Sequence, residues 1–285
     1  MPLAMAEAEK LEKLDGPITF SSGSALETVK EQSTQNSTPA ILKKLQEVYN
    51  RIAPEYSAIW GDDVQAEVMR HREAFLEIIP KNAAVVDVGT GPGRDAAWFS
   101  DHGLRAVGID FSKEMITQAQ KRHPELKFQQ MDMRRLEFES NNIDGIWDNG
   151  AFHHLPPDAA RQAFREFYRV MKTDGILFLR VKQGDGEVLQ PDKKYPDETR
   201  YFKLYQKDEL ENLAAFQGFE IIKSGIEIDS KKPEQSWVYL FARKASSALT
   251  GNEALGEYIY IINDYETRFK ALLNQYFDQS RGPNV

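Results

Sequence analysis

The sequence VVDVGTGPGRD, residues 85–95, places Gly89, Gly91 and Gly93 at alternate positions directly after an apolar run. The run predicts a buried strand that contains one carboxylate, Asp87. Glycine after such a strand permits positive φ angles and lets a ligand approach bare backbone. The segment that follows is typical of a helix, whose first N–H groups can bind an anion. The stretch therefore predicts a strand–turn–helix unit that binds a ligand.

Strand and helix patterns alternate on both sides of this stretch. Two helices are expected before it, over 41–53 and 62–79, because apolar residues there recur near helical spacing. Strands are then expected at 82–89, 104–110, 126–132, 143–150 and 175–183, with helices over 94–103, 112–123 and 156–172 between them. A further helix, which lies after residue 206 and ends near Gly218, precedes two final strands at 219–228 and 235–244. Residues 184–205 are expected to form a loop because of their glycines and prolines.

This order predicts an α/β fold of the Rossmann-like, doubly wound kind. Strands that alternate with helices of 10 to 15 residues imply βαβ units and a mostly parallel sheet with helices on both faces. The last two strands have no helix between them, so they are expected to form an antiparallel hairpin.

The composition limits the classes of partner. The 285 residues carry a net charge of −8, which disfavours nucleic acid and anionic membranes because both attract positive surfaces. Cysteine is absent, which excludes disulfides, Cys-ligated zinc and thiol nucleophiles. No apolar run approaches the ~20 residues that span a bilayer, and the N-terminus lacks a secretory signal pattern, so a cytoplasmic protein is expected.

The two ends of the chain differ from its middle. Residues 1–40 are polar and small, which predicts a flexible tail with a short helix near 3–14. Residues 41–246 contain the strand–helix alternation. Residues 247–285 form an amphipathic pattern typical of a helix. That helix has two main interpretations, packing on its own domain and a homodimer contact, with a cap over the substrate as a third.

Two carboxylates follow the next two strands. Asp110 ends the strand VGID, 17 residues after Gly93, where a carboxylate can accept hydrogen bonds from both hydroxyls of a ribose. Asp132 lies in Met131-Asp132-Met133 after the third strand, where it can meet the edge of a base. Helix capping and a simple loop carboxylate are the alternatives. The spacing G-x-G-x-G differs from that of dinucleotide binders and phosphate loops.

VVDVGTGPGRD, VGIDFS, FQQMD and IDGIWDNGAFHHLPP, in this order, resemble class I S-adenosylmethionine-dependent methyltransferases, over roughly residues 45 to 244. The resemblance implies a seven-stranded sheet with strand seven antiparallel between strands five and six. It implies S-adenosylmethionine as methyl donor and S-adenosylhomocysteine as product. The implied cofactor-binding residues are Asp87, Gly89, Thr90, Gly91, Asp110, Phe111, Asp132, Met133 and Asn149, with Tyr49 and Tyr56 closing over the cofactor.

The candidates for a general base are His153 and His154, because a reference pKa of ~6.5 suits proton removal near neutrality. The alternative is that they only shape the loop after strand four. Two adjacent histidines make a poor chelate, so no metal site is expected. Arg180 and Lys182 either pair with an acidic substrate or lie on a solvated strand edge.

Three functions remain in competition. The first is methyl transfer to an oxygen, nitrogen or sulfur atom of a small-molecule acceptor by in-line displacement. The second is a tRNA wobble-uridine type RNA methyltransferase, disfavoured by the acidic balance. The third is a protein that binds S-adenosylmethionine without catalysis. Asp148-Asn149-Gly150-Ala151 lacks the prolines and aromatic residue that methylation of planar amino nitrogens uses, which argues against those acceptors.

Overall fold

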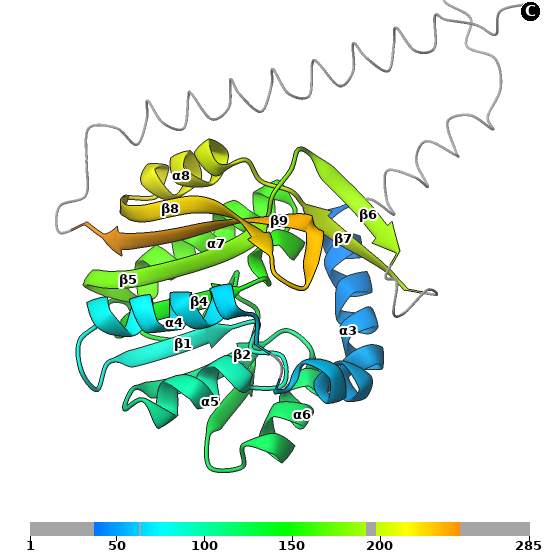
Figure 1. Ribbon diagram of the computed structural model, residues 1–285, viewed down its shortest axis with the longest axis horizontal. Helices are drawn as coiled ribbons and strands as arrows, with labels where there is room; N and C mark the ends of the chain where they lie inside the picture. The colour runs from blue at the N-terminus through cyan, green and yellow to red at the C-terminus, as the bar shows by residue number, and fades with distance from the viewer. Residues whose placement is uncertain (1–36, 63, 192–197, 246–285) are drawn as a thin grey trace, which may run out of the picture. The chain divides into compact units, whose positions relative to one another are not determined.

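The computed structural model describes residues 37–62, 64–191 and 198–245. Its centre is a seven-stranded sheet of order β3-β2-β1-β4-β5-β9-β8 (Figure 1). The expected helix near 3–14 and the C-terminal extension from residue 247 lie outside the described residues. The strands are β1 (Ala84–Val88), β2 (Arg105–Asp110), β3 (Lys127–Gln130), β4 (Ile143–Asn149), β5 (Met171–Lys182), β8 (Phe219–Asp229) and β9 (Lys232–Lys244).

The directions of the strands confirm the predicted topology. β1 to β5 run parallel to one another, with β1 between β2 and β4. β9 pairs antiparallel with β5 on one side and with β8 on the other. The seventh strand is therefore antiparallel and lies between the fifth and the sixth, and the chain order reverses beside β1.

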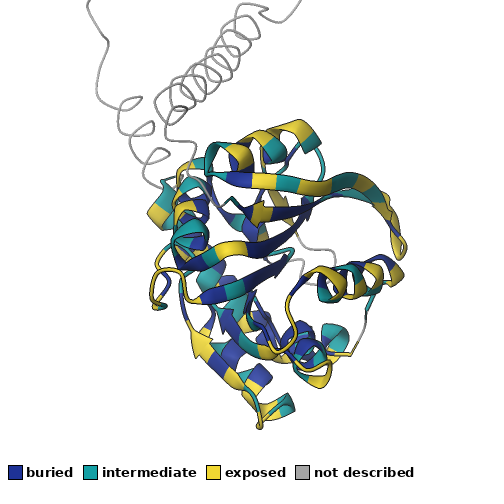
Figure 2. Cartoon of the chain, turned by 90° about the vertical axis from the view of Figure 1, so that its left-hand side faces the viewer, coloured by how far each residue is buried: buried dark blue, intermediate teal, exposed yellow. Residues whose placement is uncertain are grey.

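Helices cover both faces of the sheet. On one face α4 (Ala66–Ile78) and α5 (Arg94–Asp101) bury Phe75 and Phe99 against Trp147 and the strands, and α6 (Lys113–Arg122) packs beside α5. On the other face α7 (Pro157–Val170) and α8 (Lys207–Phe216) pack with the apolar residues of β4 and β5. The strands between these layers are mostly buried, and the outer faces of the helices are exposed (Figure 2).

The first expected helix is longer than its pattern indicated. α3 (Thr38–Trp60) buries Leu42, Leu45 and Val48 and continues through Pro54. The second was placed too early, because α4 begins at Ala66. Asp62, the first residue of the expected range, lies before α4 and accepts a hydrogen bond from Arg122 of α6.

The expectation of a loop over 184–205 was wrong. β6 (Glu187–Pro191) and β7 (Thr199–Lys203) form an antiparallel hairpin. Tyr201 and Phe202 of β7 are buried, and this burial outweighs the turn-forming residues, which fall outside the strands or at their ends. Within the described ranges no helix is long and apolar enough to cross a membrane.

Candidate functional site

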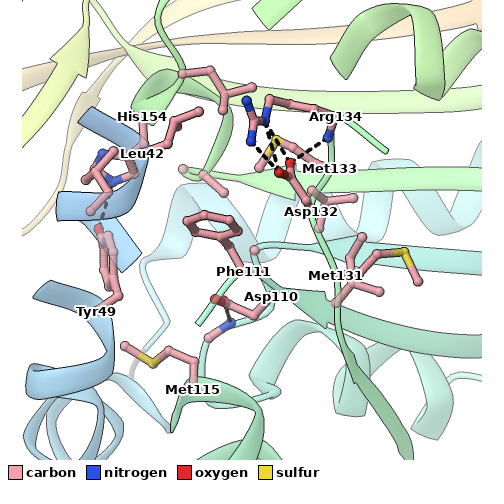
Figure 3. Close-up of a pocket in the computed structure, with 18 of the residues that line it drawn as sticks. Leu42, Tyr49, Asp110, Phe111, Met115, Met131, Asp132, Met133, Arg134 and His154 are labelled. Carbon is pink, nitrogen blue, oxygen red and sulfur yellow. Dashed lines mark hydrogen bonds and ion pairs between the residues drawn. The ribbon is translucent and has the colours of Figure 1, made fainter. Parts of the chain in front are cut away.

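A cavity opens where β1, β2 and β4 end, beside the point at which the strand order reverses. α3 closes its other side, so that Tyr49 and Leu42 lie across the cavity from Asp110 and Phe111 (Figure 3). The lining combines the glycine loop with residues that follow β2, β3 and β4: Leu42, Leu45, Tyr49, Tyr56, Val88, Gly89, Gly91, Ile109, Asp110, Phe111, Met115, Met131, Asp132, Met133, Arg134, Asn149, Gly150, Ala151, His154 and Leu155.

The glycine loop after β1 requires glycine. Gly89 and Gly91 have φ angles of 65° and 53°, which side chains rarely adopt. A Cβ on Gly89 would lie 2.1 Å from Cβ of Ala151, so the loop after β4 packs directly on it. A Cβ on Gly91 would meet nothing closer than Tyr56 at 3.8 Å. The turn therefore presents bare backbone beside an aromatic ring of α3.

Asp87 holds this loop in shape. Its Oδ2 accepts a hydrogen bond from the Thr90 hydroxyl at 2.5 Å and another from the backbone N–H of Ala96 at 3.0 Å. Burial, and then the charge of Asp95, raise the pKa of Asp87 to about 8. Asp87 therefore joins the glycine loop to the first turn of α5.

Asp110 lies at the end of β2 and faces the glycine loop. Its Oδ2 accepts from the Gly91 N–H at 3.0 Å, and its Oδ1 accepts from the Ser112 N–H at 2.8 Å. Burial raises the pKa of Asp110 to about 6, although these two hydrogen bonds oppose the rise. Ser112 also caps α6, because its hydroxyl accepts from the Met115 N–H.

The third expected carboxylate has a partner that the sequence did not suggest. Asp132 forms a bidentate pair with Arg134, whose Nε lies 3.0 Å from each carboxylate oxygen. Asp132, Met133 and Arg134 line the same end of the cavity (Figure 3). A ligand that uses Asp132 must share it with this guanidinium. The two-residue spacing of Asp132 and Arg134 was the feature of the sequence that could have indicated this ion pair.

Tyr49 and His154 meet in the wall between α3 and the loop after β4. His154 Nδ1 lies 2.7 Å from the carbonyl oxygen of Tyr201, which can only accept, so Nδ1 carries the proton. His154 Nε2 therefore accepts from the Tyr49 hydroxyl at 2.7 Å. Arg200 Nη1 donates to the same hydroxyl at 3.0 Å. Burial, and then the charge of Arg200, lower the pKa of His154 to about 3.

His153 does not line this cavity. It is 2 % exposed, and its Nδ1 accepts from the backbone N–H of Lys182 at 3.2 Å. Burial lowers its pKa well below the usual value. The loop that carries both histidines is fixed by Asp148, whose Oδ1 accepts from the N–H groups of Ala151 and Phe152. His153 therefore supports the loop, and the base hypothesis for it loses its geometric basis.

Arg180 neither faces the cavity, where it could pair with an acidic substrate, nor lies on a solvated strand edge. It is 2 % exposed and stacks on Trp237, with its Nε 2.8 Å from Glu227 and its Nη2 3.6 Å from Glu67. Arg180 is thus a buried tie between α4, β5 and β8. Lys182 donates to the Gln190 side chain and lies 3.4 Å from the centre of the Phe202 ring, against the β6–β7 hairpin.

Asn149 lines the cavity and also a smaller, more polar hollow behind the glycine loop. Its Nδ2 donates to Asp95 Oδ2 at 3.1 Å. Asp95 and Arg94 line that hollow as well. Neither residue was among the predicted site residues, although they are the last two residues of the stretch 85–95.

Residues 85–175 match the family model described as methyltransferase domain. A segment of 139 residues is 26% identical to a malonyl-[acyl-carrier protein] O-methyltransferase of Enterobacter lignolyticus. It covers 48% of this chain and 53% of that protein, so the match spans about half of that relative's length.

Solved structures share the fold. The 1,6-didemethyltoxoflavin-N1-methyltransferase of Burkholderia thailandensis, with bound 1,6-didemethyltoxoflavin and S-adenosylhomocysteine, is 22% identical, with a TM-score of 0.59 over 81% of this chain and 95% of that chain. The [4+2]-cyclase SpnF is 17% identical, with a TM-score of 0.57 over 71% and 96%. These identities show a common fold.

Proposed function

We propose that this chain, which carries a class I S-adenosylmethionine-dependent methyltransferase domain, transfers the methyl group of S-adenosylmethionine to an oxygen, nitrogen or sulfur atom of a small-molecule acceptor. The observation that carries the proposal is one cavity in which the glycine loop and Asp110 face each other. One structural neighbour is a cyclase, so the fold alone does not determine the reaction. The reaction has to be argued from the residues of the site.

The lining fits the cofactor. Asp110 would accept from the ribose hydroxyls, and Phe111 and Met133 supply apolar surface for an adenine ring. Gly91 lets the ligand approach the backbone without a Cβ in its way. Tyr49 and Tyr56 of α3 cover the opposite side, which would exclude water from the transferred group.

Bound S-adenosylmethionine supplies an activated methyl group on a sulfonium, so the protein contributes mainly alignment and desolvation. The acceptor would lie among Leu42, Leu45 and Leu155, at the end of the cavity that Tyr49 and His154 also line. His154 Nε2 is engaged by the Tyr49 hydroxyl, so Tyr49 is the polar group nearer to the acceptor. The Tyr49 hydroxyl, which donates to His154 and accepts from Arg200, would position the acceptor atom for the in-line displacement.

The relatives support a small acceptor but not one atom. The Enterobacter relative is named for O-methylation, whereas the Burkholderia enzyme is named for methylation at N1. A tRNA-type substrate would need a positive surface, and the chain carries a net charge of −8. We therefore place small acceptors first and RNA second.

The test is calorimetric titration with S-adenosylmethionine and then with S-adenosylhomocysteine. We expect saturable binding in roughly the micromolar range, the strength usual for enzyme substrates. Asp110→Ala should weaken binding by about 1–3 kcal/mol, the cost of lost hydrogen bonds to a charged group. Unchanged affinity in a folded variant would remove Asp110 from the site.

Turnover separates an enzyme from a protein that only binds the cofactor. The loaded protein is incubated with a panel of phenols, carboxylic acids, amines and thiols, and formation of S-adenosylhomocysteine is measured. Product that depends on the acceptor supports the proposal. Tight binding without product from any acceptor, RNA included, would favour the non-catalytic alternative.

A further inference from the structure

The strand β8 forms one edge of the sheet, and α8 covers only part of it. β8 has 11 residues and is about 36 Å long, whereas α8 has 10 residues and is about 15 Å long. α8 ends just before β8 begins, so the helix lies over the first part of the strand (Figure 1). The Ser224 hydroxyl of β8 donates to Glu211 of α8. The last part of β8 therefore extends beyond the helix.

The part of β8 beyond α8 carries two exposed isoleucines on one face. Ile226 pairs with Val238 of β9, which is buried on the face that α7 and α8 cover. Ile228 points to the same face as Ile226, because side chains two apart on a strand share a face. Ile226 is 49% exposed and Ile228 is 63% exposed. We call these two residues the β8 patch.

The segment 255–276 carries an apolar pattern that complements the β8 patch. Its apolar residues share one face of a helix: Leu255, Tyr258, Ile259, Ile262, Phe269, Leu272, Leu273 and Tyr276. A helix in a protein gains most of its stability when such a face packs on another apolar surface. The segment therefore needs a surface of the kind that the β8 patch offers.

The chain between β9 and this segment is long enough to reach the patch. Ala245 follows β9, and its N–H donates to the carbonyl oxygen of Gly218 at 3.3 Å, beside the start of β8. Ile226 lies about 25 Å further along the strand. Residues 246–254 span up to about 30 Å when extended. The segment 255–276 can thus pack on the β8 patch of its own chain.

A second copy of the chain is the weaker occupant of the patch. A stable interface between two proteins buries about 800 Å² on each partner. Two partly exposed isoleucines supply only a fraction of that area. A segment of the same chain is held at a high effective concentration, so it can pack on a smaller surface.

We infer that residues 255–276 dock as a helix on the β8 patch and cover the edge of the sheet beyond α8. The docked helix would shield Ile226 and Ile228 from water and would keep other chains from pairing with β8. The inference does not depend on the proposed function, because no residue of β8 lines the cavity.

The test uses the absence of cysteine from the sequence, because a single introduced thiol then reports on one position. Ile226→Cys and, separately, Ile228→Cys are made in the full chain, and the rate of reaction with an aromatic disulfide reagent is measured. Ile78→Cys is the matched control, since Ile78 is 41% exposed at the end of α4, on the opposite face of the sheet. Both reporters should react about tenfold more slowly than the control, as for a helix that is docked most of the time.

Variants of the segment show whether it provides this protection. Ile259→Glu with Ile262→Glu places two charges in the apolar face and should raise the rate at Ile226→Cys about tenfold. Asn263→Glu with Thr267→Glu places the same charges on the other side of the helix and should leave the rate within about twofold.

Two results would overturn the inference. The first is a reaction at both reporters as fast as at Ile78→Cys in the chain with its apolar face intact, which would mean that the patch is open. The second is slow reaction that persists after the apolar face is charged. If that protection grew with protein concentration and size-exclusion chromatography showed a dimer, a second copy would be the occupant.

Discussion

At the scale of single residues, Asp110 links cofactor affinity to pH. Burial raises its pKa to about 6, so the carboxyl is protonated below that pH and charged above it. The charged form accepts hydrogen bonds from ribose hydroxyls better, so affinity for S-adenosylhomocysteine should be steady above pH 6 and fall below it. The limiting slope is about tenfold per pH unit for one proton. Calorimetry on the folded protein measures this change in affinity. The titrations run between roughly pH 4.5 and 8, a range that brackets the pKa of about 6.

Asp110→Asn supplies the control for this prediction. The amide cannot titrate, so the variant should bind more weakly and should lose the inflection near pH 6. If the inflection persisted in Asp110→Asn, a group other than Asp110 would be its source.

Tyr49→Phe tests the polar end of the acceptor region. The change keeps the ring beside the cavity and removes the hydroxyl that bonds His154 and Arg200. Turnover should fall by roughly a hundredfold, the loss expected when a reacting group is misplaced by about 1 Å. Affinity for S-adenosylhomocysteine should stay within about twofold, since the lost hydroxyl bonds protein groups and not the ligand. Equal losses in both quantities would instead assign Tyr49 to cofactor binding.

The site residues divide by how far their role depends on neighbours distant in sequence. Asp110 could be predicted, because its position at the end of the second strand is itself the signal. His154 could be named but not interpreted, since its distant partners Tyr49 and Tyr201 decide its availability. Asp95 was out of reach, because two of its partners, Arg72 and Trp147, come from α4 and β4.

At the scale of elements, α3 is tied to the loop after β2. Gln46 Nε2 donates to the carbonyl oxygen of Phe111 at 2.8 Å. Asn50 Oδ1 accepts from the Ser112 hydroxyl at 2.8 Å and from the Glu114 N–H at 3.3 Å. On its other side, Arg51 pairs with Glu198 next to β7. The helix that closes the cavity is therefore held by polar contacts as well as by its apolar face.

Asn50→Ala should loosen this closure. It leaves the Ser112 hydroxyl and the Glu114 N–H without their acceptor, so the free energy of unfolding should fall by about 1–2 kcal/mol. Lys43→Ala is the matched control on an exposed position of the same helix, with an expected change within about 0.5 kcal/mol. Urea denaturation measures both, and equal stabilities would mean that the apolar face alone holds α3.

The elements show where pattern reading succeeds. The predicted bounds of the helices α5, α6 and α7 agree with the structure within a few residues, because the apolar faces of these helices repeat over several turns. The β6–β7 hairpin was missed, because strands of five residues are too short to outweigh nearby glycines and prolines. Tertiary burial of Tyr201 and Phe202 decides that hairpin, and burial is not visible in a short window.

At the scale of the whole molecule, topology and charge were the properties best founded on sequence. The alternation of strands and helices predicted a mostly parallel sheet with a terminal antiparallel hairpin, and the family resemblance predicted the place of strand seven between strands five and six. Net charge is a sum over the chain and needs no structure. Both could therefore be stated without any side-chain contact, whereas the reaction depends on the residues of the site.

The charge of −8 leads to the last prediction, which addresses the RNA alternative. A protein that neutralises several phosphates binds polyanions with an affinity that falls steeply with salt. This chain should pass through a heparin column at roughly 0.05 M salt with little retention, because its net field repels a polyanion. Strong retention that disappears by roughly 0.3 M salt would indicate a local basic surface that the net charge conceals. RNA acceptors would then move ahead of small molecules, and the turnover panel would begin with tRNA.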